Sequence, residues 1–334
     1  MVPALAVADA LRAEGAEVVF VGGERAEADL VPAAGYPLHQ LTLEGLSRRN
    51  PLRAARSIGR AAAAVVRARA LLRELGPAAV LGGGGYVAGP VGLAAALLRI
   101  PLVLTEADSH LGLANRLLVP FARRVCLAFP IEGRAGERFR VTGRPVPAPA
   151  TDRRAARALF DLGPRDFCVM VFGGSQGARS LNHAAAAAFA QADFRVLHVS
   201  GHRDFASLTA PGPHYDLRPH IERFAEALLA SDLVIARAGG SVWEIAAHGR
   251  PSILVPYPHA TADHQTTNAR WMAGAGAALM VADDELLAVR LAETVDALLD
   301  DPERLADMRD AALELARPAA GRAVAAQVMA AAGG

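Results

Sequence analysis

The sequence contains no lysine: all 35 of its basic residues are arginine, which we attribute to genome composition rather than to a mechanism. Because 34 acidic residues balance them, the formal net charge is +1, and composition gives no reason to expect a nucleic-acid partner. Cysteine is nearly absent. Cys126 and Cys168 each lie inside an apolar run and are expected to be buried, reduced thiols. No C-x-x-C or H-E-x-x-H pattern occurs, so we expect no metal site and no cofactor.

Long apolar runs are also missing. None reaches the roughly 20 residues that a membrane-spanning helix needs, although 52% of all residues are apolar. The segment Met1–Ala6 lacks the basic start and long apolar stretch of a signal peptide. These absences predict a soluble or peripheral protein of the cytoplasm. With 334 residues, the chain is long enough for two domains that each have a core.

Short apolar runs that suit strands alternate with helical segments, which predicts an α/β fold with doubly wound parallel sheets. Three prolines within residues 145–149 indicate a stiff linker. We therefore expect an N-terminal domain (1–143), a linker (144–150) and a second domain (151–317). Residues 318–334 are expected to form a helix that packs back on the N-terminal domain. The chain begins in what reads as its first helix, so the first strand and its glycine loop are expected to be missing.

The most informative motif is a glycine turn at residues 173–177, between the apolar run 167–172 and an alanine-rich helical segment. Glycines let the backbone approach a ligand closely, and N–H groups at a helix start favour an anion, most often phosphate. An ordinary strand-to-helix turn with a glycine cap is the alternative. A second turn of this kind, at residues 239–241, follows the apolar run 233–236 and strengthens the case for a nucleotide site.

Polar side chains follow these turns. Glu244 lies about one helical turn beyond residues 239–241, where its carboxylate could accept from both hydroxyls of a ribose; a solvated helical glutamate is the alternative. Segment 256–268 is dense in short polar side chains, which suit the hydroxyls of a sugar. Asp263 in this segment could instead cap a helix. His264 has no neighbouring cysteine or carboxylate that would complete a metal site.

Two features of the first half carry chemistry. Glu106, Asp108 and His110 follow a strand, so their carboxylates and imidazole could act as acid or base, and helix capping is an equal alternative. Eight arginines between Arg48 and Arg73 alternate with aliphatic residues. Such an amphipathic surface can lie on an anionic membrane, and a solvated face of an ordinary helix is the alternative.

These motifs resemble, in order and over nearly the whole chain, those of the MurG family of N-acetylglucosaminyltransferases. The matching segments are Pro3–Ala6, Gly84–Pro90, Gly112–Asn115, Gly173–Asn182, Arg237–Glu244 and Asp263–Asn268, of which Gly173–Asn182 is the most specific. The resemblance implies a GT-B fold, in which two Rossmann-like domains face a cleft. It implies an inverting hexosyltransferase that moves GlcNAc from UDP-GlcNAc to the C4 hydroxyl of MurNAc in undecaprenyl-linked lipid I, giving lipid II for peptidoglycan synthesis. It also implies a peripheral protein at the anionic cytoplasmic face of the cell membrane.

The resemblance further implies roles for single residues. Ser175 and its neighbours would hold the diphosphate, Ile221 would pack on uracil and Glu244 would bind ribose. Gln265 and Asn268 would contact the GlcNAc hydroxyls. The substrate-binding residues implied in this way are Asn115 (from the first domain), Arg144, Gly174, Ser175, Gln176, Gly177, Ile221, Gly239, Gly240, Ser241, Glu244, His264, Gln265 and Asn268.

The chain also departs from the family's pattern. The loop GGTGGH, which precedes the P-A-L-A run in the family, is absent, and its histidine is a leading candidate for the base that deprotonates the acceptor. The base is therefore unassigned, with Glu106, Asp108 and His110 as the remaining candidates. Pro147 replaces a family arginine, for which Arg144 could substitute.

We therefore expect the recorded start to lie downstream of the true one. The chain as written should then have little transferase activity, because loss of a general base costs about 10²–10⁴ in rate. Segment 105–108 differs from the family's H-E-Q-N, and His264 replaces a family glutamine. The change at 105–108 leaves open another UDP-sugar enzyme of the same fold, such as a different transferase or a UDP-GlcNAc 2-epimerase. A sugar-nucleotide-binding protein without catalysis is the third possibility.

Overall fold

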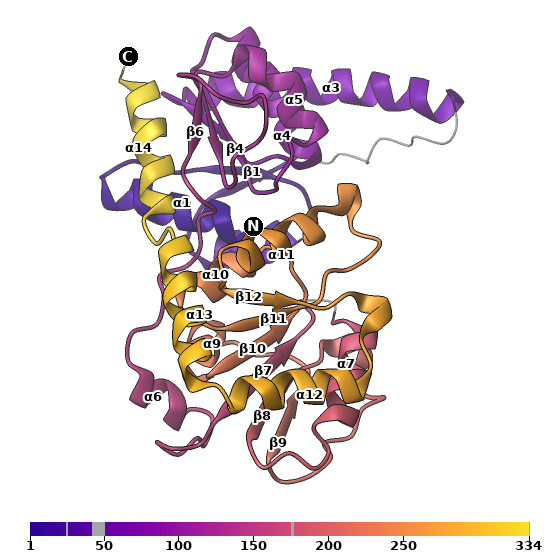
Figure 1. Ribbon diagram of the computed structural model, residues 1–334. Helices are drawn as coiled ribbons and strands as arrows, with labels where there is room; N and C mark the ends of the chain where they lie inside the picture. The colour runs from indigo at the N-terminus through magenta and orange to yellow at the C-terminus, as the bar shows by residue number, and fades with distance from the viewer. Residues whose placement is uncertain (25, 42–50, 175–176, 334) are drawn as a thin grey trace. The chain divides into compact units, whose positions relative to one another are not determined.

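The computed structural model describes residues 1–24, 26–41, 51–174 and 177–333, with the backbone alone at 51–61 and 261. The chain forms two compact units. Unit 1 comprises Met1–Pro147 together with Arg317–Gly334, and unit 2 comprises Ala148–Ala316. Each unit is built of parallel strands with helices beside them, as Figure 1 shows, so the predicted α/β class is confirmed.

Unit 2 contains one six-stranded parallel sheet in the order β9-β8-β7-β10-β11-β12. This is the doubly wound order 3-2-1-4-5-6, with β7 in the first position and β10 in the fourth. The order reverses between β7 and β10, and ligands of such sheets bind outside the carboxyl ends of the strands at this switch point. The strands are β7 (Cys168–Phe172), β8 (Arg195–Val199), β9 (Tyr215–Arg218), β10 (Leu233–Ala236), β11 (Ser252–Leu254) and β12 (Ala278–Met280).

Helices cover this sheet. Leu181 of α7 and Val295 of α12 are buried against Val169 and Ile235 of the central strands. Every residue of β7 and β10 is buried, which explains why these strands read as continuous apolar runs. The helices are α6 (Arg153–Ala158), α7 (Arg179–Ala188), α8 (His202–Phe205), α9 (Phe224–Ala230), α10 (Val242–Ala247), η2 (Thr261–Asp263), α11 (His264–Gly274), η3 (Asp283–Glu285), α12 (Ala288–Leu299) and α13 (Pro302–Leu315).

Unit 1 contains two parallel sheets, β1-β2 and β3-β4-β5-β6. Its strands are β1 (Phe20–Gly22), β2 (Leu38–Gln40), β3 (Val80–Gly82), β4 (Leu102–Glu106), β5 (Arg124–Leu127) and β6 (Phe139–Val141). Its helices are α1 (Val2–Ala13), α2 (Ala26–Ala33), α3 (Pro51–Leu75), α4 (Gly85–Leu97), α5 (Leu113–Leu118), η1 (Val119–Phe121) and α14 (Ala320–Ala332).

The edge strands β1 and β3 lie in one layer, although no backbone pairing joins them within the described residues. Phe20 of β1 and Leu81 of β3 both pack on the side of α1. Val21 and Val80 both pack on the opposite side, with α4. In the order 3-2-1-4-5-6, β1 and β3 are the neighbours of the first strand. Within the described residues, unit 1 therefore has two separate sheets in one layer, with β1 and β3 at the edges nearest each other.

Helix α14 packs on α1 and on β4 and β5. Val324 and Val328 are buried together with Val7 of α1. Gly321 allows this approach, because a Cβ at that position would lie 3.0 Å from the carbonyl oxygen of Ala6. The C-terminal segment thus completes the core of unit 1.

Within the described residues, no helix is long and apolar enough to cross a membrane, and no group of three or more histidine, cysteine or acidic side chains is placed to hold a metal ion. Cys126 and Cys168 are buried and unbridged, as predicted. Burial raises the pKa of each thiol to about 12, so both are unreactive at neutral pH.

Candidate nucleotide-sugar site

The first predicted glycine turn lies at the carboxyl end of β7, at the switch point of unit 2. Gly174 and Gly177 have φ angles of 87° and 73°, and the Gly177 N–H donates to the Gly174 carbonyl at 2.9 Å. A Cβ on Gly177 would collide with the carbonyl oxygen of Ser200. The turn leads into α7, whose N-cap residue, Ala178, has no side chain that could cap the first N–H groups. These N–H groups suit an anionic ligand.

The second predicted turn follows β10, which pairs with β7. Gly239 and Gly240 lead into α10, and Ser241 is its N-cap residue without a side-chain cap bond. Glu244 is half-buried in the first turn of α10. Because adjacent parallel strands end at the same edge, the two turns lie side by side at the switch point, as a nucleotide site requires.

Arg237 follows β10 directly and binds groups from several other segments at this edge of the sheet. The sequence motifs gave it no role. Its buried guanidinium donates to the carbonyl oxygens of Val255 and Pro256 at 3.2 and 3.1 Å, and to the Ser180 hydroxyl at 2.7 Å. It also forms a 2.7 Å ion pair with Asp283. An arginine immediately after a fully apolar strand was the signal that could have predicted this role.

The third predicted segment lies beside the second turn. The Gln265 Oε1 atom accepts from the backbone N–H of Tyr257 at 3.0 Å. Asn268 is only 2% exposed and donates through Nδ2 to the carbonyl oxygen of Ala238 at 2.9 Å. Its Oδ1 atom has no hydrogen-bond partner within the described residues. A buried amide oxygen of this kind is suited to accept from a ligand hydroxyl.

The other predicted residues of unit 2 are spread around this edge. His264 begins α11 and is half-buried, and Ile221 is buried in the loop after β9. Asp263 occupies the N-cap position of α11, but its carboxylate accepts from a threonine hydroxyl of that helix at 2.5 Å and caps no backbone N–H. Ser175 and Gln176 lie outside the described residues.

In unit 1, Glu106 shapes the loop after β4. Its buried carboxylate accepts from the backbone N–H groups of Asp108 and Gly112, at 3.2 and 2.8 Å, and from Asn115 Nδ2 at 2.9 Å. Asn115 is 1% exposed and donates also to the Thr105 carbonyl at 2.9 Å. With three donors bound, this carboxylate holds the path of the loop.

The remaining candidates of unit 1 lie near this loop. His110 is half-buried, and its Nδ1 atom has no partner within the described residues. Asp108 is half-buried as well. The Arg144 guanidinium donates to the Ala107 carbonyl at 3.3 Å. Arg144 therefore contacts the loop that carries Asp108 and His110.

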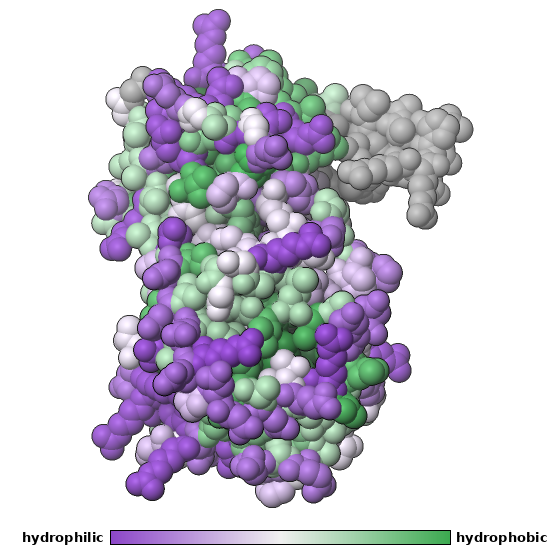
Figure 2. Space-filling view, in the orientation of Figure 1, coloured by the Kyte–Doolittle hydropathy of each residue, from purple (hydrophilic) through white to green (hydrophobic). Residues whose placement is uncertain are grey.

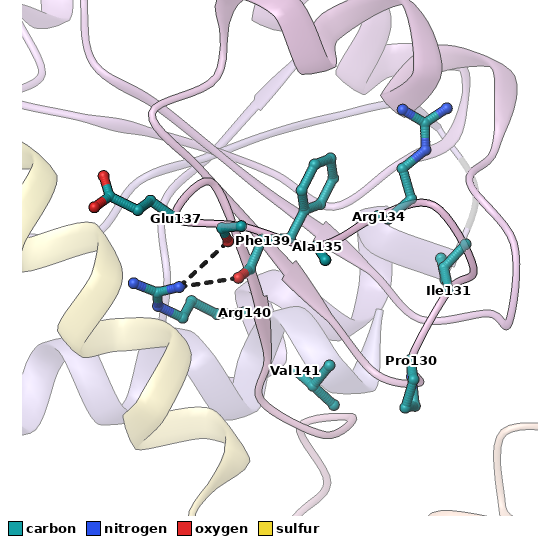
Figure 3. Close-up of a pocket in the computed structure, with 9 residues that line it drawn as sticks. Pro130, Ile131, Arg134, Ala135, Glu137, Phe139, Arg140 and Val141 are labelled. Atoms are coloured by element: carbon teal, nitrogen blue, oxygen red, sulfur yellow. Dashed lines mark hydrogen bonds between the residues drawn. The ribbon is translucent and has the colours of Figure 1, made fainter.

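A separate cavity of about 610 Å³ lies in unit 1 between β6 and the loop before it. Figure 3 shows Ile131, Phe139 and Val141 among its lining, with the Arg140 guanidinium bound to two backbone carbonyls. None of the residues that line it was predicted as a site residue. The sequence motifs thus place the candidate site at the carboxyl ends of β7 and β10, and not in this cavity.

The fold and the site define a class of protein. Unit 2 is a Rossmann-like unit with two glycine turns at its switch point, and unit 1 is a second α/β unit with two parallel sheets. Two such units in one chain are the GT-B architecture of enzymes that use nucleotide sugars.

Comparison with known proteins agrees with this class. The N-terminal domain of glycosyltransferase family 28 matches residues 1–127, and its C-terminal domain matches residues 168–324. A UDP-N-acetylglucosamine–N-acetylmuramyl-(pentapeptide) pyrophosphoryl-undecaprenol N-acetylglucosamine transferase of Rubrobacter xylanophilus is 43% identical over 331 residues, covering 97% of this chain and 98% of that protein. The equally named protein of Pseudomonas entomophila is 42% identical, with 95% and 90% covered.

Among solved structures, Acinetobacter baumannii MurG matches with a TM-score of 0.78 and 29% identity, covering 98% of this chain and 95% of that one. The chain therefore belongs to glycosyltransferase family 28 and, within it, to the MurG family.

Proposed function

We propose that this chain transfers GlcNAc from UDP-GlcNAc to the MurNAc C4 hydroxyl of lipid I, the undecaprenyl-pyrophosphoryl-linked MurNAc-pentapeptide, giving lipid II in peptidoglycan synthesis. The observation that carries this proposal is the 43% identity over 97% of the chain to a transferase of that name. The two glycine turns at the switch point of unit 2 support it, because a UDP-sugar donor needs a diphosphate site of this kind.

In this proposal, unit 2 binds the donor. The Gly174–Gly177 turn and the first N–H groups of α7 hold the diphosphate, and Glu244 accepts from the ribose hydroxyls. Asn268 offers its unpaired Oδ1 to a GlcNAc hydroxyl, and Gln265 lies one helical turn away. Negative charge develops on the leaving UDP during transfer, and helix N–H groups that face it stabilise that charge.

The acceptor hydroxyl attacks the anomeric carbon directly, so the bond to UDP breaks as the new glycosidic bond forms and the configuration inverts. A base must take the proton of the hydroxyl. Glu106, Asp108 and His110 are the candidates, and of these Glu106 already accepts from three donors. The pH dependence of their single variants would distinguish these side chains.

We also propose that unit 1 contacts the anionic cytoplasmic face of the membrane as a peripheral surface. Arg67, Arg69 and Arg73 of α3 are exposed, as are Leu97 of α4 and Leu117 of α5, at 57% and 65%. Figure 2 shows apolar residues among hydrophilic ones over the coloured part of unit 1. Basic and apolar groups together favour anionic lipid. Arg48 and Arg49 of the predicted segment lie outside the described residues.

The test is an assay with radiolabelled UDP-GlcNAc and a lipid I analogue. We expect a disaccharide product with inverted configuration, formed at the low rate that the sequence predicts for the chain as written, and none without the acceptor. Conversion of UDP-GlcNAc in the absence of acceptor would instead favour an epimerase. Binding of UDP-GlcNAc without any turnover would favour a non-catalytic binding protein. Co-sedimentation with vesicles containing anionic or neutral lipids tests the membrane surface separately.

A further inference from the structure

A chain of buried polar side chains runs through unit 2 behind the first glycine turn. Tyr215 of β9 bonds the Nδ1 atom of His198 in β8 at 2.8 Å, and His198 Nε2 lies 3.0 Å from Asn182 Oδ1 in α7. His198 and Asn182 are both fully buried, and Tyr215 is 4% exposed. Polar groups this deep are retained only when they are paired, so the three residues form one network.

The direction of each hydrogen bond follows from the chemistry of the groups. Asn182 donates through Nδ2 to the Ser200 carbonyl at 2.9 Å and to Asp204 Oδ2 at 3.1 Å, so its Oδ1 must accept from His198. Burial lowers the pKa of His198 to about 4, and the neutral ring carries its proton on Nε2. Nδ1 then accepts from the Tyr215 hydroxyl, whose pKa burial raises.

The network ends at the glycine turn. Asn182 donates to the carbonyl oxygen of Ser200. Gly177 packs so closely against this same oxygen that a Cβ on Gly177 would collide with it. Asp204 is fixed from its other side by Arg203, which donates to both carboxylate oxygens at 2.9 Å. Asn182 itself lies in the first turn of α7, directly after the turn. The network therefore fixes the Ser200 carbonyl on which the glycine turn packs, and it also fixes the start of α7, which follows the turn.

We propose that His198 and Asn182 are positioning residues for the diphosphate-binding turn: they hold the Ser200 carbonyl and the start of α7 so that Gly177 and the following N–H groups meet a nucleoside diphosphate. This inference rests on the proposed function of the turn. In the proposed site, only the diphosphate part of the ligand touches the turn. Disturbing the network should therefore weaken the binding of UDP but not of uridine, whereas a general loss of structure would weaken both. Base and ribose are bound elsewhere, by Ile221 and Glu244 in the proposed site.

The experiment measures the affinities of UDP and of uridine for the full chain, by calorimetry and by NMR titration. His198→Leu removes both hydrogen bonds, whereas His198→Gln keeps an amide N–H that can donate to Asn182. Ser231→Ala is the matched control. The Ser231 hydroxyl is equally buried and donates to the Ala227 carbonyl at 2.7 Å. It precedes β10, so it lies at the opposite end of this strand from the glycine turns. Circular dichroism checks that each variant is folded.

We expect His198→Leu to weaken UDP binding about 10-fold, as the loss of one well-placed hydrogen-bond network implies. Uridine affinity should stay within twofold, and His198→Gln should recover most of the UDP affinity. Ser231→Ala should bind both ligands like the wild type. Unchanged UDP affinity in a folded His198→Leu, an equal loss for uridine, or no recovery by His198→Gln would overturn the inference. If the wild type binds neither ligand, the proposed function is wrong and the inference falls with it.

Discussion

The neutral, buried His198 makes the stability of unit 2 depend on pH in a way that can be calculated. In the unfolded chain the ring binds a proton with a pKa near 6.5, whereas burial lowers this value to about 4 in the fold. Between these two values the unfolded state holds more protons than the folded state. The free energy of unfolding therefore falls as pH drops below 6.5, and the loss is complete only below about pH 4.

The size of the effect follows from the pKa difference of His198. One pKa unit corresponds to about 1.4 kcal/mol, so the full shift amounts to about 3 kcal/mol. Over the accessible part of the range, from pH 6.5 to pH 5, the loss is about 2 kcal/mol. Asp204, the nearest carboxylate of the network, has its pKa lowered by the hydrogen bond from Arg203, so it stays charged throughout this range.

The assay is urea unfolding followed by tryptophan fluorescence, for the wild type and for His198→Gln, at pH values from 5 to 8. Both tryptophans, Trp243 and Trp271, lie in unit 2, so the signal reports that unit. His248 also has its pKa lowered by burial, but it is present in both proteins and cancels in the difference. If the difference between the two proteins is the same at pH 5 and at pH 7.5, the reasoning is refuted.

Three further outcomes are expected. Gly177→Ala should lower the free energy of unfolding by about 2 kcal/mol in urea titrations, because it combines a positive φ with a backbone collision, and it should weaken UDP binding. Arg237→Leu should cost about 3 kcal/mol in the same titrations, because it removes a buried guanidinium that binds two carbonyl oxygens, the Ser180 hydroxyl and the partly exposed Asp283. Arg309→Leu, from an exposed ion pair, should cost under about 1 kcal/mol. The amides of Val21 and Leu81, on the unpaired edges of β1 and β3, should exchange hydrogen about 100-fold faster than those of β4, as NMR can measure.

The sequence allowed the glycine turns of unit 2 to be predicted because their signals are local. A glycine turn between an apolar run and a helix can be read within a dozen residues, and the positive φ angles of Gly174 and Gly177 agree with that reading. The alternation of strands and helices then places the second turn, with Gly239 and Gly240, at the same edge of a parallel sheet.

The network behind the turn could not be predicted in the same way. His198 reads as one polar residue inside an apolar strand, and nothing in its own segment indicates its partners. Tyr215 and Asn182 reach it only because β8 lies between β7 and β9, and α7 covers that face. Such contacts depend on strand order, which local patterns do not specify. The role of Glu106 could not be predicted for a similar reason, because its three donors are brought together only by the path of the folded loop.

The two units differ in burial at equivalent strands, and the strand order explains the difference. In unit 2, β7 fills the first position, and every residue of its neighbour β10 is buried. In unit 1, β3 occupies the position equivalent to β10, yet Leu81 at its centre is only half-buried, and Phe20 and Val21 of β1 are half-buried too. The helices α1 and α4 still pack across both edges. Leu81, Phe20 and Val21 thus keep exposed surface on strands that each have one edge without a backbone partner among the described residues.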